Sequence, residues 1–262
     1  MLRALRTAAL GMAAQQLNVD TIANNLANVN TTGYKKSSIE FQDLLYETIQ
    51  SGGAESAEGK EKPSELSIGM GNRPVSTFRS YSQGAIEETS NPFDIAISGK
   101  GFFQIEMPDG SVSYSRDGAF RVNSSGAMVN SSGLEMYPNI TLPEDVQSVS
   151  ISQDGVVSAI MEGQVAPQEF GQIELANFMN PAGLNPLGGN LLGATEASGD
   201  PNYGMAGESG FGTIMQGYLE KSNVDVVKEM VGLIVAQRSY EINSKAVKTA
   251  DEMLAMINAL KR

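Results

Sequence analysis

The chain has 262 residues, of which 41% are hydrophobic and 18% charged, as expected for a folded protein with one large domain or two modest ones. It contains no His, Cys or Trp. Their absence excludes Ser-His-Asp and Cys-His catalytic groups, thiol redox chemistry, the usual structural zinc sites and histidine pH switches.

The net charge of −12 is concentrated in the middle of the chain. Residues 37–217 hold 7 basic and 23 acidic side chains, whereas residues 1–36 and 218–262 carry net charges of +3 and +1. An acidic middle argues against nucleic acid or anionic lipid as a partner. No stretch approaches 18 consecutive apolar residues, so we expect no direct membrane span.

A helix of about 30 residues is predicted at the N-terminus. Leu5, Met12, Val19 and Leu26 recur every seven residues, which is the spacing of a coiled-coil seam. Gly33 is expected to be the left-handed residue that follows the helix. The first residues faintly resemble a signal peptide, but the heptad continues through them. We therefore expect export, if it occurs, without a cleaved signal peptide.

The segment 24–35 is rich in asparagine, at positions 24, 25, 28 and 30. One interpretation is a frayed helix end followed by a turn, since these amides compete for backbone groups. The other is that the amides of Asn25 and Asn28 hydrogen-bond across a helix–helix interface and fix its register. We favour the second.

Residues 37–65 are predicted to form a short helix and a linker. Ser37-x-x-Glu40 is a capping box, and the apolar face of the helix would consist of Phe41, Leu44, Leu45 and Ile49. Residues 51–63 are then mostly Gly, Ser, Glu and Lys, which is the composition of a flexible linker.

From 66 to 217 the apolar period becomes two, which indicates a β-rich domain of hairpins. Turns are predicted at Asp109-Gly110, Asp117-Gly118 and Asp154-Gly155. The stretches 122–126 and 129–133 share the pattern Val-Asn-Ser-Ser-Gly and should enter similar turns. Residues 180–212, rich in Gly and Pro, are expected to be mostly loop.

The last forty residues carry the longest periodic pattern of the chain. Ser222-x-x-Asp225 is a capping box, so the helix should begin near Asn223. A seam of over four heptads follows, and Gly232 is its weak point, costing roughly 1 kcal/mol against Ala. The a positions of these heptads are Val226, Leu233, Tyr240, Val247 and Leu254. The d positions, three residues later, are Glu229, Ala236, Asn243, Ala250 and Ile257.

The fold class predicted from these patterns is α+β. The two terminal helices are predicted to pair as one coiled-coil domain, made of 1–36 with 218–262. Residues 66–217 form a β-rich outer domain inserted between them, and residues 37–65 connect the helical domain to it. Two arrangements fit equally well: a helical hairpin buried against the middle domain, or arms that pack against other copies of the chain. The predicted self-assembly interface comprises Leu5, Met12, Val19, Asn25, Leu26, Asn28, Val226, Leu233, Tyr240, Asn243, Val247 and Leu254.

No group of residues forms a catalytic, cofactor or metal motif. Ser98-Gly99-Lys100-Gly101 lacks the phosphate-loop spacing and is interpreted as a tight turn. The Asp-Gly pairs lack the alternating ligands of a calcium loop. Glu87-Glu88 could belong to a carboxylate-dependent cell-wall hydrolase, but adjacent side chains point apart. We expect no enzyme and no cofactor; the hydrolase and a passive binding module remain minor alternatives.

Four segments resemble bacterial flagellar rod and hook proteins. Residues 24–35 resemble the N-terminal signature of that family, 98–104 with 114–120 its β-domain core, and 237–246 its C-terminal arm. The likeness covers essentially the whole chain in the right order. The size and residues 41–46 resemble the distal rod members in particular. Proximal rod and hook paralogues are the nearest alternatives.

The resemblance implies a structural subunit that catalyses nothing. Copies would polymerise helically into a hollow drive shaft across the periplasm, as part of the flagellar basal body, and transmit torque from motor to hook. Subunits would leave the cell through the flagellar type III channel. The implied partners are the chain itself, proximal rod proteins, the hook protein and the surrounding bushing ring.

Overall fold

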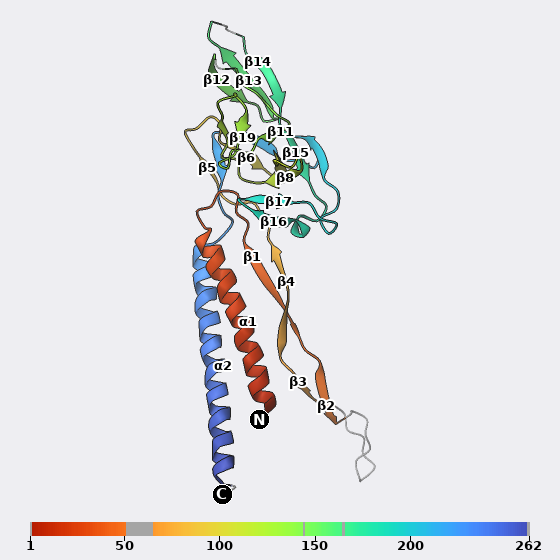
Figure 1. Cartoon of the computed structure of the whole chain (residues 1–262), viewed down its shortest axis with the longest axis vertical. Helices are drawn as coiled ribbons and strands as arrows, with labels where there is room; N and C mark the ends of the chain where they lie inside the picture. The colour runs from red at the N-terminus through yellow and green to blue at the C-terminus, as the bar shows by residue number, and fades with distance from the viewer. Residues whose placement is uncertain (1, 51–64, 144, 164–165, 261–262) are drawn as a thin grey trace. The chain divides into compact units, whose positions relative to one another are not determined.

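The computed structural model describes residues 2–50, 65–143, 145–163 and 166–260 (Figure 1). The chain divides into two compact units. Unit 1 consists of Met1–Leu26, Ser37–Phe78 and Val226–Arg262, and unit 2 of Ala27–Lys36 and Arg79–Asp225. A helix near each end and a β-rich middle confirm the α+β class.

Unit 1 contains the two long helices, α1 (Leu2–Ala27) and α2 (Val226–Leu260), which lie side by side (Figure 1). α2 begins three residues later than its capping box predicted. α1 ends at Ala27, so Gly33 is not its terminating residue. Gly33 is left-handed, with φ 67°, but it belongs to a later turn.

Two β-ladders complete unit 1: β1 (Ser37–Asp43) pairs with β4 (Asn72–Arg79), and β2 (Tyr46–Gln50) pairs antiparallel with β3 (Leu66–Gly69). The prediction of a short helix from Ser37 is therefore wrong. A capping box is a local signal, and pairing with residues 66–79 outweighs it. The predicted linker at 51–63 lies outside the described residues.

The largest sheet of unit 2 has seven strands, in the order β16-β17-β8-β7-β15-β18, with β11 also paired to β7. These strands are β7 (Phe102–Glu106), β8 (Val112–Ser115), β11 (Met136–Tyr137), β15 (Glu174–Asn177), β16 (Asn185–Gly188), β17 (Leu191–Gly193) and β18 (Asn202–Met205). The prediction of mostly loop at 180–212 missed β16, β17, β18 and the short 3₁₀ helix Pro181–Gly183.

Smaller antiparallel sheets surround this one. They are β12 (Val146–Ile151) with β13 (Val156–Met161) and β14 (Gln168–Gln172); β6 (Ile95–Ser98) with β19 (Thr213–Gln216); β5 (Ile86–Glu88) with β20 (Tyr218–Glu220); and β9 (Arg121–Val122) with β10 (Met128–Val129). Buried side chains from the large sheet, the smaller sheets and the segments between them form the main core of the unit, and they include Ile97, Phe103, Phe120, Met128 and Ile173.

Most of the predicted turns are confirmed. Asp109-Gly110 joins β7 to β8 and Asp154-Gly155 joins β12 to β13. Asn123 and Asn130 each accept backbone N–H groups on their side-chain oxygen in matching turns, as the repeated pattern predicted. The prediction of a hairpin turn at Asp117-Gly118 is wrong, because β8 pairs with β7 and β17 and not with β9.

A buried ion cluster joins distant segments of unit 2. Lys35 Nζ lies 2.5 Å from Glu220 Oε1, and Arg116 Nε lies 3.4 Å from Glu220 Oε2. The three side chains are at most 5% exposed. Burial lowers the pKa of Lys35, and the attraction of Glu220 opposes that effect. A cluster of two cations and one carboxylate keeps a net positive charge inside this acidic unit.

Candidate self-assembly surface

The two helices of unit 1 contact each other through small side chains. Ala14 on α1 and Ala236 on α2 are each 1% exposed. A Cβ added to Gly11 would lie 2.8 Å from Asn243 Nδ2, and one added to Gly232 would lie 3.4 Å from Ile22. An added Cβ would therefore crowd the Asn243 amide at Gly11, whereas at Gly232 it would make an ordinary van der Waals contact.

Asn25 links α1 to two other segments of unit 1. Its Nδ2 donates to Ser37 O at 2.8 Å and to Glu229 Oε2 of α2 at 3.2 Å, and its Oδ1 accepts from Ser37 N at 2.9 Å. This amide thus bonds across a helix–helix contact within one chain. Its predicted role between copies stays a prediction.

Most of the predicted interface residues are half-buried within the chain itself. Leu5, Met12, Val19 and Leu26 on α1 are half-buried, as are Leu233, Asn243, Val247 and Leu254 on α2. Val226 and Tyr240 are 39% and 42% exposed. Val19 and Tyr240 line one shared groove of about 430 Å³. Asn28 is half-buried and belongs to unit 2. The role of these residues between copies stays a prediction.

Sequence reasoning missed a second apolar face on α2. Six side chains on it are between 51% and 70% exposed: Val227, Met230, Val231, Ile234, Val235 and Ile242. At 3.6 residues per turn they lie on the side of the helix opposite Glu229, Ala236 and Ala250, all of which are buried. We call these six residues the outer face of α2. The available signal was that residues 230–236 hold no charged or polar side chain on any side of the helix, which is typical of a helix covered all round.

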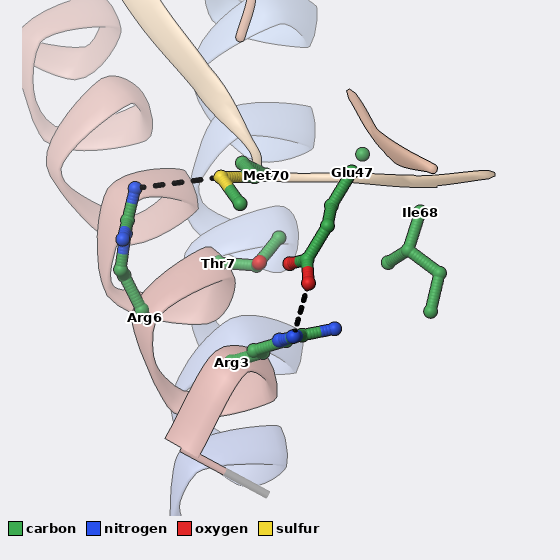
Figure 2. Close-up of a pocket in the computed structure, with 7 residues that line it drawn as sticks. Arg3, Arg6, Thr7, Glu47, Ile68 and Met70 are labelled. Atoms are coloured by element: carbon green, nitrogen blue, oxygen red, sulfur yellow. Dashed lines mark hydrogen bonds and ion pairs between the residues drawn. The ribbon is translucent and has the colours of Figure 1, made fainter. Parts of the chain in front are cut away.

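The strands β1 to β4 of unit 1, which we call the ribbon, contact the first turns of α1 (Figure 2). Arg3 Nη2 lies 2.6 Å from Glu47 Oε1 of β2, and Arg6 Nη2 donates to Met70 Sδ at 3.8 Å. Thr7 and Leu10 lie against Gly71. The Arg3–Glu47 pair is exposed, so it orients the ribbon more than it stabilises the fold.

The ribbon also exposes apolar side chains. On β1–β4 and the loop between β1 and β2, these are Phe41, Leu45, Tyr46, Ile49, Leu66, Ile68, Val75 and Phe78. Together with the outer face of α2, they give unit 1 far more exposed apolar surface than scattered single residues would.

Within the described ranges, no three His, Asp or Glu side chains are placed to hold a metal ion. No helix in that part of the chain is both long and apolar enough to cross a membrane.

Comparisons with known proteins match the chain from end to end. Three family models match: "Flagella basal body rod protein" at residues 5–35, "Flagellar hook protein FlgE/F/G D1 domain" at 96–159, and "Flagellar basal body rod FlgEFG protein C-terminal" at 215–260. The flagellar basal-body rod protein FlgG of Borreliella burgdorferi is 48% identical over 264 residues, covering 100% of both chains. The chain belongs to the flagellar basal-body rod protein family.

Two further members of the flagellar basal-body rod protein family show the same end-to-end similarity. FlgG of Buchnera aphidicola subsp. Baizongia pistaciae is 45% identical, covering 99% of this chain and 100% of that protein. FlgG of Bacillus subtilis is 38% identical, covering 100% of both. The predicted family is confirmed, and this rod-family chain is a structural flagellar protein, not an enzyme.

Proposed function

We propose that the chain is a structural subunit of the flagellar distal rod. Copies polymerise helically into a hollow drive shaft that transmits torque from the motor to the hook. The relatives named FlgG support a rod subunit, and an interface that repeats without closing a ring produces an open helical polymer.

The outer face of α2 is the observation that carries this proposal. Its six apolar side chains cannot all gain from α1, because α1 contacts the opposite side of the helix. Burying one such side chain fully is worth about 1.5–3 kcal/mol, so a neighbouring copy that covers the face gains a large driving force. The paired terminal helices would then form a coiled-coil inner domain of 1–36 with 218–262, and 66–217 would form the outer domain.

The test is polymerisation of a variant with a charge on that face. We expect Val231→Glu to abolish tubes seen by electron microscopy, because assembly would bury a carboxylate without a partner. Val231→Leu is the matched control, since it keeps an apolar side chain at the same position and should still form tubes.

Tube formation by Val231→Glu at the unchanged concentration would contradict the proposed interface. Both variants should keep the circular dichroism of the unchanged chain, because Val231 is exposed and makes little contribution to the fold. Leu233 and Val247 are poorer choices for such a test, since both are half-buried and charges there would disturb unit 1 itself.

Family membership supports assembly with other flagellar proteins. We infer that the ends of the polymer contact proximal rod proteins and the hook protein, and that the acidic outer domain faces the bushing ring as the rod crosses the periplasm. Export would use the flagellar type III channel without cleavage of a signal peptide. A proximal rod or hook paralogue is the alternative. Tubes that are straight and stiff favour a rod subunit, and curved flexible ones favour a hook subunit.

A further inference from the structure

Two cavities in unit 2 share a wall made by Tyr81 and Arg116. The larger, of about 450 Å³, is also lined by Lys100, and the smaller by Lys35 and Arg79. Among the described residues that line either cavity there is no Asp or Glu. Four basic side chains thus surround Tyr81, with no carboxylate facing them from the cavity walls.

This clustering is unusual for its surroundings. Unit 2 has seven basic and eighteen acidic residues, a net charge of −11. Four of those seven basic residues line the two cavities. Glu220 neutralises one charge, since it pairs with both Lys35 and Arg116. A net positive site therefore remains in a unit that is otherwise strongly negative.

Three side-chain atoms are buried without a hydrogen-bond partner in the described structure: the Tyr81 hydroxyl and Arg116 Nη1 at the shared wall, and Glu220 Oε2, which lies 3.4 Å from Arg116 Nε. Arg116 is buried, and its Nη2 donates to Gly99 O. Burial raises the pKa of Tyr81, so its hydroxyl stays protonated and can donate. Unused buried donors are costly, and a carboxylate is the acceptor that suits a guanidinium best.

The larger cavity also has apolar walls. Phe102 and Phe178 pack edge to face with ring centroids 5.9 Å apart, and Met179 at the cavity is 99% exposed. A ligand that suits these walls carries a carboxylate next to an apolar stem, as a Glu or Asp side chain on a peptide does.

We propose that the cavity lined by Tyr81, Lys100 and Arg116 binds an acidic side chain of a second copy of this chain. Charge complementarity selects that occupant: outside the two cavities, unit 2 carries three basic residues against eighteen acidic ones. A neighbouring copy therefore presents carboxylates in excess. The inference rests on the proposed polymer and adds to it a polar contact that sets register, independent of the apolar outer face of α2.

The first experiment compares two charge reversals. Lys100→Glu reverses an exposed cation at the cavity, and Arg121→Glu reverses an exposed cation on β9 that lines neither cavity. Both change the net charge by the same amount. We expect Lys100→Glu to raise the concentration of chain left unassembled after the tubes are sedimented by about tenfold or more, and Arg121→Glu to change it less than about twofold.

The second experiment identifies the occupant. Tubes grown from equal amounts of ¹⁴N- and ¹⁵N-labelled chain are treated with a carbodiimide, which joins an amine to a carboxylate in direct contact. We expect peptides in which Lys100 of one label is joined to an Asp or Glu of the other label, and no such peptides from unassembled chain.

Each outcome decides the matter. Equal effects of the two reversals, or Lys100 links found only within one label or not at all, overturn the inference. If tubes form and Lys100→Glu is neutral, only the cavity contact is wrong and the proposed function stands. If the unchanged chain forms no tubes, the proposed function is wrong and the inference falls with it.

Discussion

Lys35, Arg116 and Glu220 form the buried ion cluster of unit 2, and two of them, Lys35 and Arg116, also line its cavities. Glu220 also accepts Gly84 N at 2.8 Å, so a single carboxylate holds three other segments. Sequence reasoning placed Lys35 in the family signature but could not pair it with Glu220, because 185 positions separate the two and local patterns carry no information on such pairs.

Removal of Lys35 should cost far more stability than removal of an exposed lysine. Lys35→Ala leaves the buried Glu220 carboxylate with Arg116 as its remaining cation. We therefore expect the free energy of unfolding to fall by about 3–5 kcal/mol. Lys221→Ala is the matched control, since Lys221 and Glu87 form an exposed pair 2.6 Å apart, and it should cost at most about 1 kcal/mol. Urea unfolding followed by circular dichroism measures both. Similar losses would show that the buried pair is not important for stability.

Helix α2 shows how far a periodic pattern can be trusted at the scale of one element. The heptad spacing included Ala236 and Ala250, and both are buried. The heptad spacing did not reveal that the opposite side of α2 is apolar too, because it considers only the residues at positions a and d. Knobs-into-holes packing between α1 and α2 stays a prediction. For residues 37–50, pairing with strands distant in sequence decided the structure, which no capping signal anticipates.

A larger side chain at the contact between the helices should separate them. Ala236 is 1% exposed, so Ala236→Leu adds volume where none is available, and we expect a loss of about 1–3 kcal/mol in unfolding free energy. Ala246→Leu, at an exposed position of the same helix, should change stability by less than about 0.5 kcal/mol. The helical circular dichroism signal in a urea titration reports both, and equal effects would argue against a close α1–α2 contact in solution.

At the scale of the whole molecule, apolar burial is uneven. Unit 2 has a contiguous core of buried side chains, whereas unit 1 exposes apolar residues on α2 and on its ribbon. Charge predicted an acidic middle between nearly neutral ends, and the apolar period of two predicted that this middle is β-rich. The domain limits at 36/37 and 217/218 stay predictions.

Hydrogen exchange should reproduce this difference between the units. In the unassembled chain we expect amides of β7 and β15 to exchange at least about 100-fold more slowly than those of α2, because local opening exposes little buried area in the helix pair. Assembly should then slow exchange along α2, most of all at residues 227–242. Exchange in α2 that is equally slow before and after assembly would contradict burial of its outer face by another copy.

The outer face of α2 also bears on the life of the chain before it reaches its place of use. A free copy exposes to water an apolar surface that can bind other apolar surfaces non-specifically. A cell that makes such a chain must keep it dilute, bound to a chaperone or unfolded until it can add to the end of a growing polymer. The feature that drives growth at the right site is the same one that would drive clumping at the wrong one.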